Sequence, residues 1–365
     1  MKALFDRISR WPGSSRIDMP EIYMTESPLN PANQQIFTVE ALRGVAALAV
    51  TWFHMTNTYS LDWVRYSGFN GWLGVDMFFV ISGFIIPYSL HRSKYKLAYF
   101  PRFLLRRLVR LEPPYLISIA VVLILWELAA RTPGFAGSPP TYSIGQVLAH
   151  FLYLIPLTNY PWLNIVYWTL AYEFVFYILA GLLWPVLSHR SLLFTAALVA
   201  CIQAIDIALL REHVTGAALL FFVGICCARK RLKLDPPWLS LSAAVIAVVA
   251  LWWIVEPMVA LVSFGTAFFI AFVDIPRLRV LGFLGAISYS LYLLHVPIGG
   301  RVVNIGRRFV DGPVQEFFLS LVALAVSLLV ATIFWKYVEE PAKRASKRVA
   351  LSPPFARVAS PSTPR

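Results

Sequence analysis

Long apolar runs, separated by short polar stretches, make up most of the 365-residue sequence. An α-helix needs about 20 consecutive, mainly apolar residues to cross the hydrocarbon core of a membrane. Many of the runs approach this length, so the pattern predicts an all-α, polytopic membrane helix bundle with about ten transmembrane helices. The predicted spans are approximately residues 40–59, 72–91, 112–131, 164–186, 191–210, 214–228, 238–255, 258–273, 284–303 and 315–336.

The first predicted span carries two ionisable side chains, Arg43 and His54, with only apolar residues, small residues and one threonine between them. A helix turns about 100° per residue, so eleven residues return the chain to within roughly 20° of the same face, about 16 Å along the axis. Ionisable groups are costly in a membrane and usually face a bundle interior or a water-filled cavity. We therefore expect Arg43 and His54 to lie on one stripe of an intramembrane active site.

Small residues on the same helix predict a close helix contact. Gly44, Ala47 and Thr51 follow one another at steps of three and four, which lets a second backbone approach. The candidate partner is the second predicted span. That span contains Asp76, which we expect either to pair with the arginine or histidine of the first span or to be solvated at the outer interface.

Two arginines, Arg107 and Arg110, lie three residues apart in the segment "RRLVRLEPPY", residues 106–115. On a helix such residues share a face, and paired guanidinium groups hold phosphate oxygens through charge-assisted hydrogen bonds. The alternative is ordinary anchoring of a cytoplasmic connection, where basic residues accumulate. Glu339 or Glu340, after the last predicted span, is expected to bridge to this basic connection.

Two later spans also carry polar side chains. In "YWTLAYEFVFY", Glu173 could act as a base or orient a histidine. Its alternative role is a structural ion pair with an arginine. In "GAISYSLYLLHVPI", Ser288, Tyr292 and His295 form a polar seam that could hold a substrate carbonyl or hydroxyl group. The alternative for this seam is an interfacial belt of Tyr and His.

Composition and charge support a membrane protein. Hydrophobic residues account for 58% of the chain and charged residues for 14%, whereas soluble domains carry about 25% charged residues. The net charge is +13. Because no nucleic-acid motif accompanies it, we attribute the charge to positive-inside bias and lipid headgroups rather than to nucleic acid. Basic residues are concentrated after the second span, at 229–233 and at 343–348, which predicts that both termini are cytoplasmic.

The domain organisation follows from the same pattern. A membrane domain is expected at residues 38–341, between a cytoplasmic N-terminal tail at 1–37 and a basic, disordered cytoplasmic tail at 342–365. The three cysteines lack metal-ligand spacing, and no phosphate-binding loop, dinucleotide fingerprint or nucleophile elbow is present. No metal and no bound cofactor are therefore expected.

Five segments, in this order, resemble the acyltransferase 3 family of membrane acyltransferases: "LRGVAALAVTWFH", "GVDMFFVISGFII", "RRLVRLEPPY", "YWTLAYEFVFY" and "ISYSLYLLH". The resemblance extends from about Ala41 to Pro341. It implies a ten-helix bundle in a bacterial inner membrane. Members move acyl groups, usually acetyl and sometimes succinyl or longer, from cytoplasmic acyl-CoA to acceptors such as sugars of lipopolysaccharide, exopolysaccharide or peptidoglycan. Some members carry a fused extracytoplasmic hydrolase-like domain, which this chain is expected to lack.

The resemblance also implies roles for individual residues. The family's pattern of an arginine, ten residues and a histidine matches the pair in the first span, and its paired arginines match those of the basic connection. His54 is then expected to take a proton from the acceptor hydroxyl or to carry the acyl group briefly, while Glu173 or Asp76 orients its imidazole. The residues expected to bind acyl-CoA or the acceptor are Arg43, Arg107, Arg110, Tyr115, Trp168, Ser288, Tyr292 and His295.

The implied partners are acyl-CoA as donor substrate, a carbohydrate or glycolipid acceptor, membrane lipids and proteins of polysaccharide synthesis. Two other classes of function share some of these features. A transporter of an anionic or glycosylated lipid would also have a basic mouth and intramembrane charges, but it predicts discontinuous helices and an internal repeat, which the sequence does not show. A membrane scaffold for a polysaccharide synthase predicts that His54 is dispensable.

Overall fold

The computed structural model describes residues 31–59, 62–132, 140–209 and 216–349. The predictions for residues 1–30 and 350–365 lie outside these ranges. Within them the regular structure is entirely helical, with no strand. The α-helices are α2 (Pro31–Thr56), α3 (Trp63–Gly68), α4 (Gly74–Arg92), α5 (Phe100–Ala130), α6 (Ile144–Phe151), α7 (Trp168–Leu187), α8 (Leu192–Leu209), α9 (Ala217–Arg231), α10 (Pro237–Ile254), α11 (Pro257–Phe272), α12 (Arg279–Leu294), α13 (Gly300–Gly306), α14 (Pro313–Phe334) and α15 (Glu340–Lys347).

Among the described residues, six helical segments are long and apolar enough to cross a membrane. The chain is therefore an all-α membrane protein, but the predicted count of ten spans is not confirmed. A helix occupies each predicted range, but α2, α8, α9 and α11 are not among the six. Of these, α11 has only 16 residues, and α9 has 15 residues and ends in three basic ones. The six segments are Trp63–Arg92, Leu97–Ala130, Trp168–Leu187, Pro237–Ile254, Arg279–Phe309 and Pro313–Lys347.

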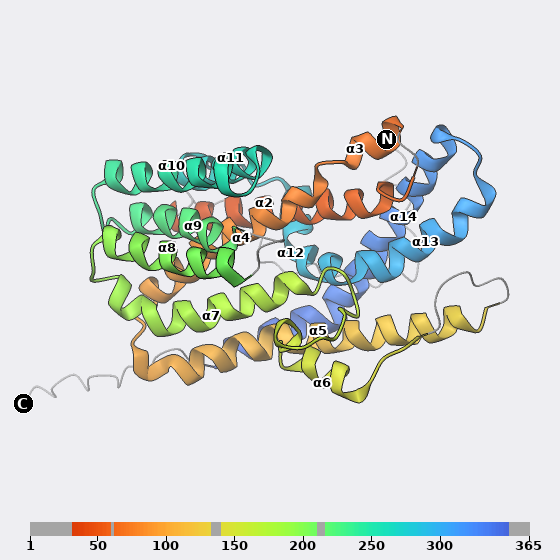
Figure 1. Ribbon diagram of the computed structural model, residues 1–365, viewed down its shortest axis with the longest axis horizontal. Helices are drawn as coiled ribbons and strands as arrows, with labels where there is room; N and C mark the ends of the chain where they lie inside the picture. The colour runs from red at the N-terminus through yellow and green to blue at the C-terminus, as the bar shows by residue number, and fades with distance from the viewer. Residues whose placement is uncertain (1–30, 60–61, 133–139, 210–215, 350–365) are drawn as a thin grey trace, which may run out of the picture.

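Most of the helices run roughly side by side along the long axis of the molecule (Figure 1). Helices α8 to α11 gather at one end, and α13 lies at the other. The largest apolar core is shared by α4, α7, α9, α10 and α11. In it the rings of Phe176 and Phe221 stack with centroids 4.0 Å apart. This core holds α4 and α7 in place, and both helices contribute to the site described below.

Helix α5 is longer than predicted. The expected span began at residue 112, with Pro113 and Pro114 at its start, but the helix begins at Phe100 and continues through both prolines. The hydroxyl of Tyr289 in α12 donates a hydrogen bond to the carbonyl oxygen of Leu111, at 3.1 Å, beside the prolines. The basic connection is therefore largely helical, and its arginines belong to a continuous helix that enters the bundle.

Helix α12, rather than α4, packs against the small residues Gly44 and Ala47 of α2. A β-carbon placed on Gly44 would lie 2.8 Å from the backbone nitrogen of Gly285, so the two helices meet almost backbone to backbone. Ala47 is buried beside Leu291 of α12. The prediction that α4 faces this stripe is wrong for these residues. Helix α4 approaches α2 further along, where Gly74 lies against Ala46.

Two π-helical turns extend the last helices. The turn η5 (His295–Gly299) joins α12 to α13, and η7 (Trp335–Glu339) joins α14 to α15. In η5, Pro297 has no N–H to donate to the carbonyl oxygen of Leu293, and the amide of Asn164 donates to that oxygen at 3.4 Å. Turns of this kind occur often at functional sites, and both of them place side chains near the site.

Candidate functional site

A cavity of about 580 Å³ lies between α2, α4, α5, α7, α12 and α15. On α4 its lining extends from Val75 to Arg92, which corresponds to about 26 Å of helix. The cavity therefore reaches from the end of the bundle where α4 finishes deep into the membrane domain. Its length along α4 suits an elongated ligand.

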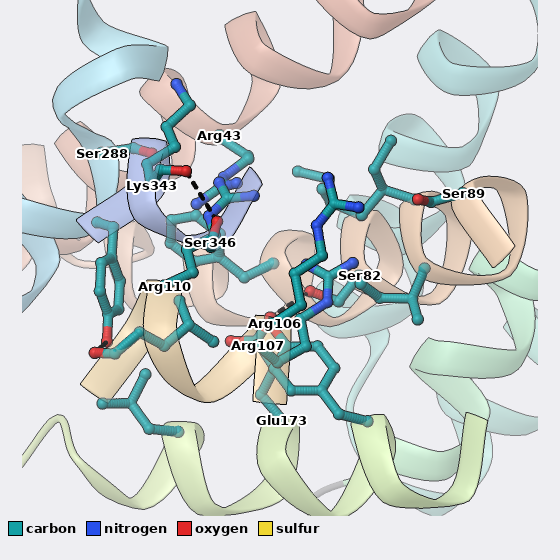
Figure 2. A pocket seen from close by; sticks show the side chains of 18 of the residues that line it. Arg43, Ser82, Ser89, Arg106, Arg107, Arg110, Glu173, Ser288, Lys343 and Ser346 are labelled. Atoms are coloured by element: carbon teal, nitrogen blue, oxygen red, sulfur yellow. Dashed lines mark hydrogen bonds between the residues drawn. The ribbon is translucent and has the colours of Figure 1, made fainter. Parts of the chain in front are cut away.

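The lining of this cavity is strongly basic. Seven of its side chains are cationic and one is acidic, Glu173. Figure 2 shows Arg43 entering from α2 and a row of arginines entering from α5. A concentration of positive charge in a partly enclosed site attracts anions, and guanidinium groups match phosphate geometry. The cationic residues are Arg43, Arg92, Arg106, Arg107, Arg110, Lys343 and Lys347.

Arg107 is held in place by aromatic rings. Its guanidinium carbon lies 5.3 Å from the ring centroid of Tyr177 and 5.5 Å from that of Phe103. Both arginines of the predicted pair, Arg107 and Arg110, line the cavity together with Arg43. The predicted grouping of these three residues is therefore present in the fold.

Glu173 lines the cavity but does not contact His54. Its Oε1 atom accepts a hydrogen bond from the hydroxyl of Ser82 at 2.7 Å and another from the hydroxyl of Tyr177. Because Tyr177 also packs against Arg107, the carboxylate belongs to the basic part of the site. Within the described residues, no ion pair or hydrogen bond joins Glu173 to a histidine.

Two predicted residues of α12 lie at the deep end of the cavity. Ser288 and Tyr292 both line it. The hydroxyls of Tyr292 and Thr169 are 2.7 Å apart, and the Tyr292 hydroxyl also donates to the carbonyl oxygen of Val166 at 3.2 Å. The ring of Tyr292 lies next to that of His295, with centroids 5.8 Å apart. Tyr292 therefore separates the cavity from the histidines beyond it.

His54 and His295 form a pair just beyond the deep end of the cavity. Their ring centroids are 5.1 Å apart and the ring planes meet at 43°. His295 is fully buried, whereas His54 is partly exposed. Neither ring lines the cavity, and His295 follows Tyr292 by one helical turn. The nearest aromatic neighbour of His54 on its own helix is Phe53, with centroids 5.0 Å apart.

Asp76 is not a partner of either Arg43 or His54. It lies in the first turn of α4, is 6% exposed, and does not line the cavity. Its Oδ2 atom has no hydrogen-bond partner among the described residues, and the neighbouring charge is that of Glu256 at the start of α11. The predicted pairing is therefore absent, and the alternative of a solvated carboxylate does not hold either, because the side chain is buried.

Tyr115 and Trp168, which the resemblance placed at the substrate, do not line the cavity. Tyr115 is buried and stacks on Tyr153, with centroids 5.2 Å apart. Trp168 packs against Phe79 and Tyr172, at 6.2 and 5.7 Å between centroids. Both residues support the helices around the site.

Some residues of the site were not predicted from the sequence. Lys343, Ser346 and Lys347 of α15 line the cavity, although this region was expected to belong to a disordered tail from residue 342. Lys343 and Lys347 are four residues apart, and this helical spacing was a usable signal.

Glu339, one of the two glutamates predicted to bridge to the basic connection, is buried and contacts α12. Its Oε2 atom accepts hydrogen bonds from the backbone N–H of Ser290 at 3.1 Å and from its hydroxyl at 2.5 Å. Glu340 instead pairs with residues of its own helix, Lys343 at 3.5 Å and Arg344 at 3.1 Å. Glu339 is therefore bonded to α12, and within the described residues no ion pair or hydrogen bond joins Glu339 or Glu340 to the basic connection as predicted.

Comparison with known proteins assigns the chain to a family. The acyltransferase domain model of the acyltransferase 3 family matches residues 36–335. The chain belongs to this family. The matched range is close to the membrane domain that was predicted at residues 38–341. It includes every helix that lines the cavity except α15.

Two relatives illustrate the range of the family. The chain is 25% identical over 362 residues to the O-acetyltransferase OatA of Staphylococcus aureus, covering 84% of this chain and 57% of OatA. It is 30% identical over 324 residues to the putative membrane-bound transacylase BcsY of Komagataeibacter xylinus, covering 80% of both chains. The chain thus spans little more than half the length of OatA. No solved structure is significantly similar to it.

Proposed function

We propose that this protein is a membrane O-acyltransferase that moves an acyl group, in the simplest case acetyl, from acyl-CoA to a hydroxyl group of a cell-surface or exported carbohydrate. The observation that carries the proposal is the elongated basic cavity that ends beside a pair of histidines. Family membership and the names of the relatives, an O-acetyltransferase and a transacylase, support the same reaction class.

The donor would lie along the cavity. Acyl-CoA carries several phosphate groups at one end and the thioester at the other. Arg43, Arg107 and Arg110 would hold phosphate oxygens through charge-assisted hydrogen bonds. The thioester would then reach the deep end, near Ser288 and Tyr292. Their hydroxyls, which donate to the carbonyl oxygens of Gly285 and Val166, would turn to donate to the oxyanion that develops on the thioester carbonyl.

His54 would act as the base at the reacting atoms. The acceptor hydroxyl attacks the thioester carbonyl carbon, His54 takes its proton, the C–S bond breaks, and the proton passes to the departing CoA sulfur. In the alternative route, His54 attacks first and carries the acyl group before the acceptor takes it. Both routes require the side chain of Tyr292 to move, because its ring lies between the cavity and the histidine pair.

The two substrates would approach from opposite sides of an inner membrane. The basic mouth, with Lys343 and Lys347, would face the cytoplasm, as the positive-inside rule requires. Both termini would then be cytoplasmic, and the acceptor would arrive from the extracytoplasmic side together with proteins of polysaccharide synthesis. No metal or bound cofactor has a part in this proposal, and the described residues contain no group of three or more metal-ligating side chains.

Transfer of label from radiolabelled acetyl-CoA in membranes tests the proposal. The wild type is expected to move label to a glycan or glycolipid, and His54→Ala, at equal protein level, is expected to lower the rate of transfer about 100-fold or more, to a residual rate that can still be measured. His189→Ala is the matched control, because that histidine is exposed and outside the site. Absence of transfer by the wild type from both acetyl-CoA and succinyl-CoA would reject the proposal in favour of lipid transport.

A further inference from the structure

The two histidines are brought together by the register of two helices. Gly44 of α2 lies against Gly285 of α12, and each histidine follows its glycine by ten residues. Because the helices run in the same direction at close distance, His54 and His295 reach the same level of the bundle. The 5.1 Å separation of their ring centroids follows from this register.

The protonation of His295 is set by its own helix. Its Nδ1 atom lies 3.0 Å from the carbonyl oxygen of Leu291. A carbonyl oxygen only accepts hydrogen bonds, so Nδ1 carries the proton and Nε2 carries a lone pair in the neutral ring. Nε2 is buried and has no hydrogen-bond partner among the described residues. A buried acceptor without a partner is unfavourable, and the neighbouring imidazole of His54 is able to supply one.

The environment of the pair contains aromatic rings rather than acids. His295 contacts Tyr292, whose hydroxyl is already bonded to Thr169 and Val166. His54 contacts Phe53. Glu173 is bonded to Ser82 and Tyr177. Within the described residues, no carboxylate is hydrogen-bonded to either imidazole, so the acid of a hydrolase-type triad has no counterpart here.

We infer that His295 is the positioning residue of His54: its Nε2 accepts a hydrogen bond from an N–H of the His54 ring and stabilises the charge that forms on that ring. This inference rests on the proposed function and deepens it. The ring centroids are close enough for an edge-to-edge N–H···N bond after a small rotation.

In this arrangement, one nitrogen of His54 donates to His295 and the other nitrogen keeps its lone pair. That lone pair takes the proton of the acceptor hydroxyl while the hydroxyl oxygen bonds to the thioester carbon and the C–S bond breaks. The same proton then passes to the CoA sulfur. His54 returns to its neutral form, and His295 keeps its own proton on Nδ1 throughout. A neutral partner also avoids burying a separate carboxylate in a low-dielectric site.

Two conservative variants separate this role from a structural one. The amide of Asn occupies the place of a histidine Nδ1, and the longer Gln places its amide near Nε2. His295→Asn therefore keeps the bond to Leu291 and removes the acceptor toward His54. His295→Gln does the reverse. Steady-state acyl transfer with the full-length protein in lipid nanodiscs, with acetyl-CoA as the variable substrate, measures both variants, and His189→Gln serves as the control.

We expect His295→Asn to lower kcat by about 100-fold or more, the usual contribution of acid–base assistance, with the KM for acetyl-CoA changed by less than about threefold. His295→Gln should retain at least about a tenth of the wild-type kcat. In the His54→Ala background, His295→Asn should have no further effect, because a residue that acts through another loses its role with it. Retained activity in His295→Asn with loss in His295→Gln would overturn the inference.

The proposed function and the inference fail in distinguishable ways. Absence of acyl transfer by the wild type would reject the function. Wild-type transfer with equal kcat values in the two His295 variants, or additive effects of His54→Ala and His295→Asn, would reject the role of His295 alone. Thermal unfolding of each purified variant identifies a loss of activity that is caused by misfolding. If a His295 variant unfolds at a lower temperature than the wild type, the role of His295 is judged from whether the effects of His54→Ala and His295→Asn on kcat are additive.

Discussion

Gly44 of α2 and Gly285 of α12 meet where a β-carbon on Gly44 would lie 2.8 Å from the backbone nitrogen of Gly285. No other residue type fits this contact without moving one of the helices. Helix α2 carries Arg43 and His54, and the residues of the site on α12 are Ser288, Tyr292 and His295. The glycine contact therefore fixes how the side chains of the two helices are aligned along the helix axes.

Replacing Gly44 with valine should therefore separate the two helices. Overpacking of a tight contact costs about 1–3 kcal/mol of folding free energy, and the displacement should also reduce acyl transfer strongly by moving His54 away from His295. Thermal unfolding in detergent and transfer assays measure the two effects. Gly265→Val is the control, since no atom lies within 4 Å of a β-carbon at that position. Equal behaviour of the two variants would contradict the importance of this contact.

Arg107→Ala should weaken donor binding. The guanidinium lines the basic cavity and is held over the ring of Tyr177. Loss of a charge-assisted hydrogen bond is worth about 1.5–3 kcal/mol, which raises the KM for acetyl-CoA by roughly 10- to 100-fold. The effect should shrink at high salt if phosphate is the partner. Arg131→Ala, whose side chain is 78% exposed, is the control and should leave KM unchanged.

Glu173→Gln should change donor binding more than the chemical step. The carboxylate accepts bonds from Ser82 and Tyr177 and lies beside the arginines, whereas no contact links it to His54. We expect a severalfold change in the KM for acetyl-CoA and a kcat within about tenfold of wild type, because a general base would contribute about 100-fold or more. A loss of kcat beyond that range would show that Glu173 acts in the chemistry.

Asp76→Asn is the matched comparison for that experiment. Asp76 is also a carboxylate of a predicted span, but it is buried and does not line the cavity. We expect the KM for acetyl-CoA and the kcat to remain within about threefold of wild type. A selective loss of kcat would restore Asp76 as a partner of His54.

Arg229 supports the fold rather than the site. It is 1% exposed, pairs with Asp235 at 2.5 Å, and donates to the carbonyl oxygens of Leu187 and Arg190 at 2.6 and 3.0 Å. Arg229→Met would leave Asp235 as an unpaired buried charge, which costs about 3–5 kcal/mol. Thermal unfolding should therefore occur at a clearly lower temperature. The double variant Arg229→Met/Asp235→Leu should recover part of the loss, and no recovery would contradict the buried-charge explanation.

Features that depend on local composition and spacing could be predicted from the amino-acid sequence. Apolar runs predict membrane helices because length and hydropathy govern insertion, and helical spacing groups Arg107 with Arg110 on one face. The five segments, in their order along the chain, indicated the family that the domain match then confirmed. The number of spans could not be predicted as well, because helices such as α9 and α11, with 15 and 16 residues, are shorter than the roughly 20 residues that a span needs.

The pairing of side chains from different helices depended on the tertiary structure. Helical periodicity places Asp76, Glu173 and His295 on faces of their helices, but it carries no information about which other helix each face contacts. The glycine contact between α2 and α12 selects His295 as the neighbour of His54, the bonds to Ser82 and Tyr177 engage Glu173, and α15 brings Lys343 to the cavity. These pairings arise because helices that are far apart in the chain pack against one another. Spacing along a single sequence shows which residues share a helix face, but not which distant residues that face contacts.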